Sequence, residues 1–171
     1  MEKKQKTNHK DFNKNLKEFK RVYLTLKDKY PDLPGFDNLN KDFQIEKLCK
    51  TQTDFLIKEI RKMILDKFFD YLKFIESLLN PVAESPLFIF SIIKKIDNTK
   101  KESLSEIYKK ISSLEFEIIK LDLNYSEEQE VKAVIRYYNL WQDIKKELTN
   151  TFSLLEKEVE KSNLKNTSYL G

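Results

Sequence analysis

The chain has 171 residues, enough to bury a substantial core, and its 40% hydrophobic and 12% aromatic content excludes a wholly disordered polypeptide. With two glycines and four prolines there is little material for hairpins, so the composition predicts an all-α fold. The formal net charge is +4, and the single cysteine, Cys49, excludes an intramolecular disulfide and a cysteine metal cluster. We interpret Cys49 as a small buried hydrophobic residue rather than a reactive thiol.

Residues 1–10 are polar and are expected to form a flexible N-terminus. No export signal or membrane-spanning run is visible in the sequence, so we predict a cytoplasmic protein. From residue 11 to residue 30 the apolar positions recur every three or four residues, which predicts an amphipathic helix that ends before Pro31. The segment 30–40, with Pro34 and Gly35, is expected to form a loop.

Residues 55–79 form the most apolar stretch, in which 15 of 25 residues are Phe, Leu, Ile, Met or Tyr. Nine charged residues within it argue against a membrane span. We therefore predict the central helix of a bundle, covered by other helices of the chain or of a partner. It is expected to begin near Asn40 or Asp42, with a kink near residues 51–53. Its polar positions form one stripe: Glu59, Lys62, Asp66, Asp70, Lys73 and Ser77.

Asn80 and Pro81 end this helix, and Ser85-Pro86 signals a new helix start. The residues that follow, up to Ile96, predict a short buried helix over 86–96. Thr99 and Glu102 have the spacing of a capping box before a helix that reaches residue 121. Its expected apolar ladder is Leu104, Ile107, Ile111, Leu114, Ile118 and Leu121.

Ser126 and Gln129 repeat the capping-box spacing and predict the start of the last helix. Its expected seam is a heptad series interrupted by Lys145, comprising Val131, Val134, Tyr138, Trp141, Leu148, Phe152, Leu155 and Val159. This spacing is compatible with a coiled coil, but the aromatic residues favour an intramolecular bundle. The predicted architecture is an antiparallel bundle of four long helices and one short buried helix, in a single domain over 11–161 followed by a flexible tail over 162–171.

The sequence lacks the residues that several kinds of catalytic and binding site require. The sole histidine, His9, lies in the expected flexible N-terminus, which argues against a histidine base, zinc site or Ser-His pair. Gly35 and Gly171 are the only glycines, so no glycine-rich loop is present to bind a phosphate. We expect no cofactor and no enzymatic activity.

Carboxylate chemistry with magnesium remains as a minor alternative, acting on a phosphorylated small molecule. The candidate pairs are Asp66 with Asp70 and Glu127 with Glu130. Solvated helix-neighbour ion pairs explain the first pair, and stabilisation by the helix dipole explains the second without a ligand.

Basic charge is concentrated at the beginning of the chain. Residues 1–29 contain ten Lys or Arg and four acidic residues, a net charge of +6. Lysine pairs also occur at 94–95, 100–101 and 109–110. These features suggest a nucleic-acid-associated protein that contacts phosphates through its first helix and the lysines at 94–110. The candidate phosphate contacts are Lys94, Lys95, Lys100 and Lys101. A plain solvated face is the competing interpretation.

The leading hypothesis is a non-enzymatic interaction or assembly module. Tyr137 is expected to lie beside the seam of the last helix, where it can contact a protein partner. The apolar residues also exceed what four amphipathic helices need, and surplus apolar surface usually covers another chain. We therefore expect a helix face to be presented to a protein partner, with a homodimer as one form of the assembly.

Overall fold

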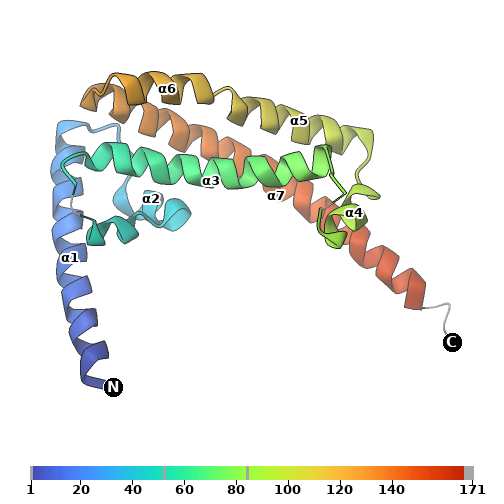
Figure 1. The fold of residues 1–171 in the computed structure, drawn as a ribbon, viewed down its shortest axis with the longest axis horizontal. Helices are drawn as coiled ribbons and strands as arrows, with labels where there is room; N and C mark the ends of the chain where they lie inside the picture. Colours follow the sequence, from blue (N-terminus) through green and yellow to red (C-terminus); the bar gives the residue numbers. More distant parts are fainter. Residues whose placement is uncertain (1, 52, 84, 168–171) are drawn as a thin grey trace. The chain divides into compact units, whose positions relative to one another are not determined.

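A computed structural model describes residues 2–51, 53–83 and 85–167, and it confirms the all-α fold class. The described residues contain seven α-helices, one 3-10 helix (η1) and no strand (Figure 1). The elements in chain order are α1 (Glu2–Lys29), α2 (Phe36–Phe43), η1 (Ile45–Lys50), α3 (Leu56–Leu79), α4 (Leu87–Ile93), α5 (Asn98–Ser112), α6 (Glu115–Leu123) and α7 (Glu127–Thr167).

The internal contacts divide the chain into two compact units, where the sequence predicted one domain. Unit 1 comprises Met1–Lys67 and Leu121–Asn139. Unit 2 comprises Phe68–Lys120 and Leu140–Gly171. Residues of both α3 and α7 therefore belong to both units.

In unit 1 the aromatic face of α1 packs on the short elements that follow it. Phe19 and Tyr23 are buried, and each meets the ring of Phe36 at 5.7 Å between centroids. The Tyr23 hydroxyl donates a hydrogen bond to the carbonyl of Pro34, which holds the connecting loop against the helix. The ammonium of Lys27 donates to two further carbonyls of this loop. Polar side chains of α1 thus satisfy loop carbonyls that α2 and η1 do not pair.

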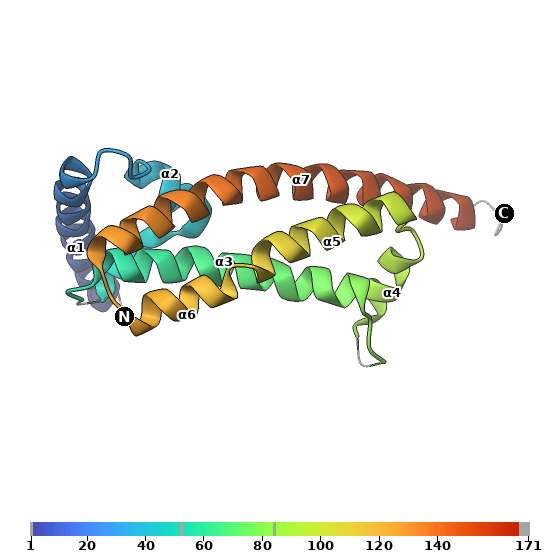
Figure 2. The same cartoon turned by 90° about the horizontal axis from the view of Figure 1, so that it is seen from above.

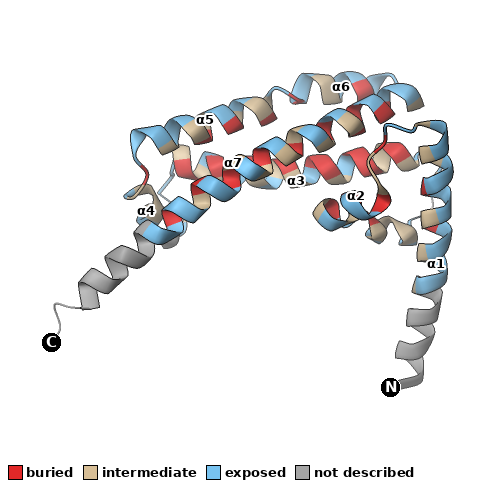
Figure 3. Ribbon diagram, turned by 180° about the vertical axis from the view of Figure 1, so that it is seen from behind, coloured by how far each residue is buried: buried red, intermediate tan, exposed pale blue. Residues whose placement is uncertain are grey.

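In unit 2 aromatic residues of α3 contact α7 edge to face. The centroids of Phe68 and Trp141 lie 5.8 Å apart, and those of Phe74 and Phe152 lie 5.6 Å apart. The later part of α3, α5 and the middle of α7 run along one another (Figure 2). Buried residues recur along one side of α5 (Figure 3), as its apolar ladder requires: Leu104, Ile107 and Ile111.

The central helix has the predicted amphipathic character but is shorter than expected. Lys62, Asp66, Asp70 and Lys73 of the polar stripe are exposed, and α3 ends at Leu79 as Pro81 requires. The chain before Leu56 is not one continuous helix, because α2 and η1 precede it. None of the described helices combines the length and the apolar run that a membrane crossing requires.

The expected loop after Gly35 is wrong, because α2 begins at the next residue. Phe36, Leu39 and Phe43 follow a 3, 4 spacing and are all buried, so burial of this face outweighs the turn signal of Pro34-Gly35. Asn40 lies inside α2, and its side chain accepts a hydrogen bond from the backbone of Glu46 in the first turn of η1.

Several other expected caps and boundaries change. Asp97, rather than Thr99, caps α5, since its carboxylate accepts from the backbone N–H of Lys100 at 2.9 Å. The expected helix over 99–121 is divided into α5 and α6. The short helix expected over 86–96 is α4, in which Ile89 is buried while Phe90 is half-buried. Residues 2–10 belong to α1 and residues 162–167 to α7, whereas residues 1 and 168–171 lie outside the described chain.

The seam of α7 differs from the predicted heptad series. Tyr137 and Ile144 are fully buried, whereas Tyr138 and Lys145 are half-buried. When Tyr137 and Ile144 take the places of Tyr138 and Lys145 in the predicted series, its members are still three or four residues apart and no charged residue interrupts it. The buried series is Val131, Val134, Tyr137, Trp141, Ile144, Leu148, Thr151 and Leu155.

Candidate functional site: a groove beside α1

Two open cavities in unit 1 lie between α1 and the segment that leads into α3. Their volumes are about 600 and 570 Å³. They share four lining residues, so we treat them as one groove, named here the α1 groove. The shared residues are Val22, Thr53, Asp54 and Leu56.

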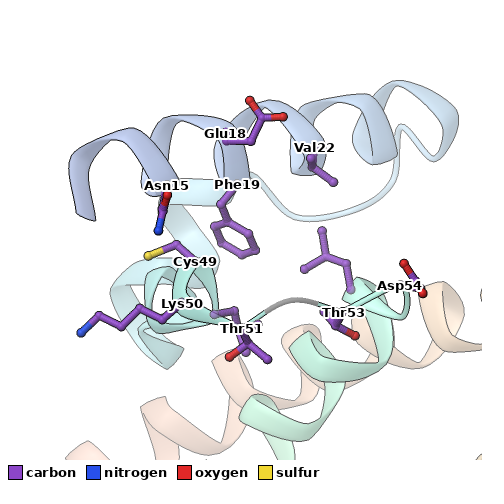
Figure 4. A pocket seen from close by; sticks show the side chains of 11 residues that line it. Asn15, Glu18, Phe19, Val22, Cys49, Lys50, Thr51, Thr53 and Asp54 are labelled. Carbon is purple, nitrogen blue, oxygen red and sulfur yellow. The ribbon is translucent and has the colours of Figure 1, made fainter. Parts of the chain in front are cut away.

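The floor of the α1 groove is apolar and comes from three elements. Helical spacing places Phe19, Val22 and Leu26 of α1 along the groove. Opposite them lie Leu48 of η1 and Leu56 of α3. In the close view of the first cavity, the side chains of Phe19 and Val22 point from α1 towards the segment that carries Thr51 and Thr53 (Figure 4). Val22 remains 46% exposed, so the chain itself does not cover this floor.

The rim of the groove carries charges that are mostly paired within the chain. Arg21 contacts Glu18 at 2.6 Å, and Lys29 contacts Glu127 at 2.6 Å. The hydrogen bond from Lys29 lowers the pKa of the Glu127 carboxyl, and Tyr30 donates a second bond to the same oxygen at 2.9 Å. The two pairs leave the rim close to neutral.

Asp54 differs from these rim residues. It is exposed and lines both cavities, and no ion pair to it exists in the described parts of the chain. A carboxylate without a cation at the edge of an apolar floor suits a ligand that brings one positive charge.

One end of the groove carries two exposed aromatic rings. Phe55 precedes α3 and Tyr125 lies in the turn between α6 and α7, and their centroids are 4.8 Å apart in an edge-to-face arrangement. The two residues are 49% and 42% exposed, and Tyr125 lines the second cavity. Burial and the neighbouring carboxylates of Glu127 and Glu130 raise the pKa of the Tyr125 hydroxyl, so it stays protonated and can donate a hydrogen bond.

Cys49 lines the first cavity and is half-buried, rather than fully buried as expected (Figure 4). Burial raises the pKa of its thiol, although Lys50 acts in the opposite direction. A raised pKa reduces the thiolate fraction, which fits the interpretation of Cys49 as an unreactive residue.

A buried ion pair lies elsewhere in unit 1, and the sequence analysis did not predict it. Arg61 of α3 and Glu130 of α7 are both 0% exposed, and Nε of Arg61 lies 2.5 Å from Oε2 of Glu130. Nη2 of Arg61 also lies 2.7 Å from Oδ1 of Asp122, which Lys58 contacts at 3.1 Å. Burial alone lowers the pKa of Arg61, but the carboxylates of Glu130 and Asp122 together outweigh it and the pKa is raised. Glu130 therefore has a buried partner, which dipole stabilisation alone did not predict.

Tyr137, the expected partner contact, lies in the buried series of α7 rather than beside it, and its side chain is fully buried. Its hydroxyl has no hydrogen-bond partner among the described residues, and burial raises its pKa. A side chain in this position packs in the core and offers no surface to another protein.

The lysines expected to contact phosphate are not uniformly available. Lys94 and Lys101 are exposed and Lys95 is half-buried. Nζ of Lys100 lies 2.7 Å from the carboxylate of Asp97, and its side chain is 11% exposed. The structure therefore does not join these four lysines into one free cationic surface.

The candidate magnesium ligands Asp66 and Asp70 are exposed on α3. In the described chain, no group of three or more His, Cys, Asp or Glu side chains is placed to hold a metal ion. Comparison with protein families, characterised proteins and solved structures finds no match to this chain. Its function has to be inferred from its own residues.

Proposed function

We propose that the chain is a non-enzymatic helical interaction module whose α1 groove receives an amphipathic helix of a protein partner. The observation that carries the proposal is an apolar floor left open beside two exposed aromatic rings. Burial of such rings contributes strongly to binding, since aromatic residues supply large contact area at low cost in conformational entropy. Recognition of an amphipathic helix in an apolar groove is a recurrent mode of protein binding.

The dimensions of the groove suit a helix of a few turns. Its lining residues on α1 extend from Asn15 to Lys29, which corresponds to about 21 Å at 1.5 Å per residue. A partner helix of similar length would place apolar residues at positions i, i+3 or i+4, and i+7 on the floor. Such a helix fills the groove along its whole length.

The charges of the rim add one requirement. Because the Glu18–Arg21 and Lys29–Glu127 pairs are satisfied within the chain, Asp54 is the rim carboxylate that a partner can neutralise. We therefore expect a Lys or Arg near the edge of the apolar face of the partner helix. This pairing would set the direction of the helix more than its affinity.

The proposal can be tested with a library of amphipathic helical peptides selected for binding to the intact protein. Val22→Asp places a charge on the groove floor and is expected to weaken the selected peptides at least tenfold. Leu24→Asp is the matched control, because Leu24 is a 54% exposed aliphatic residue on the same helix that does not line the groove. Phe55→Ala is expected to weaken binding as well, since it removes one of the two exposed rings.

Selected peptides that bind the Val22→Asp protein as tightly as the wild type would refute the groove as the binding site. A library that yields no binder would also count against the proposal. Light scattering over a range of concentrations examines the homodimer as one form of the assembly. A dimer that Val22→Asp dissociates and Leu24→Asp preserves would identify a second copy as the partner.

A further inference from the structure

The side of α1 that faces away from its buried residues carries a row of positive charges. Lys14, Lys17 and Arg21 are exposed and follow a 3, 4 spacing, which puts them on one stripe of the helix. Phe19 and Tyr23, which are buried, lie on the opposite side. The sequence repeats the same spacing towards the N-terminus, at Lys10, Lys6 and Lys3.

This row is less neutralised than three of the lysines of α5. No ion pair joins Lys14 or Lys17 to a described residue, and Arg21 keeps 76% of its side chain exposed beside Glu18. The lysines of α5 in unit 2 contrast with them, since each of three contacts a carboxylate at 3.0 Å or less: Lys100 with Asp97, Lys109 with Glu106 and Lys110 with Glu147.

We infer that the exposed basic stripe of α1 binds the phosphodiester backbone of a nucleic acid, chiefly through Lys14 and Lys17, which do not line the α1 groove, whereas Arg21 belongs both to the stripe and to the rim of the groove. Successive cations lie about one helical turn, roughly 5.4 Å, apart along a straight axis. Such a line suits a polymer that carries many negative charges in a row, such as a nucleic-acid strand, whose phosphates at about 3.4 Å of axis are dense enough to offer each cation a partner without a one-to-one register.

The residue types define what this stripe can recognise. Lysine contacts phosphate as a point charge, whereas reading of base edges relies largely on bidentate groups such as arginine. Arg21 is the one arginine of the described stripe, and Glu18 occupies its guanidinium. Binding is therefore expected to be independent of base sequence.

An anionic lipid surface is less suited to this helix. Interfacial helices bind membranes by inserting an apolar face between the lipids. The aromatic residues of the apolar face of α1 are already occupied within unit 1, where Phe19 and Tyr23 pack against Phe36, and the uncovered Val22 lies inside the α1 groove. Leu24 is the exposed apolar residue next to the cationic stripe in the described chain, and one such residue provides little insertion.

The test is a salt titration of binding to a short fluorescein-labelled DNA duplex, followed by fluorescence anisotropy with the full chain. Binding through phosphates predicts that the affinity falls linearly with salt on a logarithmic plot, with a slope of about 0.9 per contact. Lys14→Gln combined with Lys17→Gln is expected to lower that slope by about 2. A duplex of unrelated sequence should bind equally well.

The matched control is Lys94→Gln combined with Lys101→Gln, which removes two exposed lysines from unit 2 and should leave the slope unchanged. Circular dichroism verifies that both double variants remain helical.

The inference is overturned if the duplex does not bind at low salt, or if the control weakens binding as much as the α1 variant. Tighter binding to vesicles of anionic lipid than to the duplex would overturn it in favour of a membrane surface. Val22→Asp should leave duplex binding intact, which separates this inference from the proposed function.

Discussion

Helices α3 and α7 contact each other through a charged pair in unit 1 and through aromatic rings in unit 2. In unit 1, Arg61 meets Glu130, and both are fully buried. Two turns later on α3, in unit 2, Phe68 meets Trp141 edge to face. The two contacts come from the same helices but have different energetics, since a buried ion pair must recover a large desolvation cost while an aromatic pair has none of that size.

This comparison shows that burial alone does not describe the core. Phe68 stabilises unit 2 through the area that it removes from water. Arg61 contributes little net stability with its partners present but leaves a buried charge if one of them is removed. Four predictions test the contrast, from the largest expected effect to the smallest.

The largest effect is expected for Arg61→Ala, which leaves Glu130 buried without a cation. We expect the free energy of unfolding, measured by urea denaturation, to fall by up to about 5 kcal/mol. The double variant Arg61→Met with Glu130→Met removes both charges and should recover most of this loss. A double variant no more stable than the single one would contradict the interpretation of the pair.

In unit 2, Phe68→Ala removes a buried ring and is expected to lower the free energy of unfolding by about 3–4 kcal/mol. The loss should not depend on salt, because no charge is involved. Phe116→Ala is the control, since Phe116 is 77% exposed in the same unit and its truncation should change stability by less than about 0.5 kcal/mol. Equal losses in the two variants would mean that Phe68 does not belong to the core.

A smaller effect concerns the pH dependence of unit 1. Partial burial of Asp122 acts to raise its pKa, but hydrogen bonds from Lys58 and Arg61 outweigh this and the pKa is lowered. A lowered pKa means that the carboxylate stabilises the fold above its ordinary pKa, near 3.9, and that this contribution is lost as the pH falls through the folded value. We expect less than about 1 kcal/mol, because Asp122 is about half exposed.

Asp122→Asn should therefore be less stable than the wild type at neutral pH and approach it in acid. The measurement is thermal unfolding at neutral pH and at pH values below the ordinary pKa of aspartate. A stability difference that stays constant over this range would show that Asp122 makes no pH-dependent contribution.

The smallest effect is expected at the surface of unit 2. Lys109 contacts Glu106 at 3.0 Å, and both side chains are more than half exposed. Lys109→Ala should change the free energy of unfolding by less than about 0.5 kcal/mol, because water screens the pair and alanine favours the helix. A loss comparable to that of Arg61→Ala would erase the distinction between buried and exposed pairs.

The all-α fold and several boundaries could be predicted from local patterns. The end of α3 before Pro81 and the start of α7 after Ser126 follow directly from residues that stop or cap a helix. The α2 helix was missed because Pro34-Gly35 is also typical of a loop. The apolar spacing of Phe36, Leu39 and Phe43 was present in the sequence and would have predicted it.

The core partners could not be predicted in this way. Arg61 and Glu130 are 69 residues apart, so no local spacing connects them. Tyr137 and Tyr138 are both compatible with the spacing of three or four residues between apolar positions, so the spacing does not tell which of the two is buried. The apolar residues of α1 predicted a buried face, but which of them remained uncovered depended on where η1 and Leu56 lie. The α1 groove could therefore be found only from the three-dimensional arrangement of these elements.

Gln44 joins α2 to η1 in a left-handed backbone conformation, with φ of 55° and ψ of 41°, and it is the one non-glycine residue with a positive φ in the described chain. Asparagine and glycine adopt this conformation most readily, whereas β-branched residues are strained in it. Over evolutionary time, position 44 should therefore drift among a narrow set of residues, while exposed neighbours such as Lys41 and Lys47 vary freely. Related sequences that keep this connection between α2 and η1 should then show a restricted choice of residues at position 44.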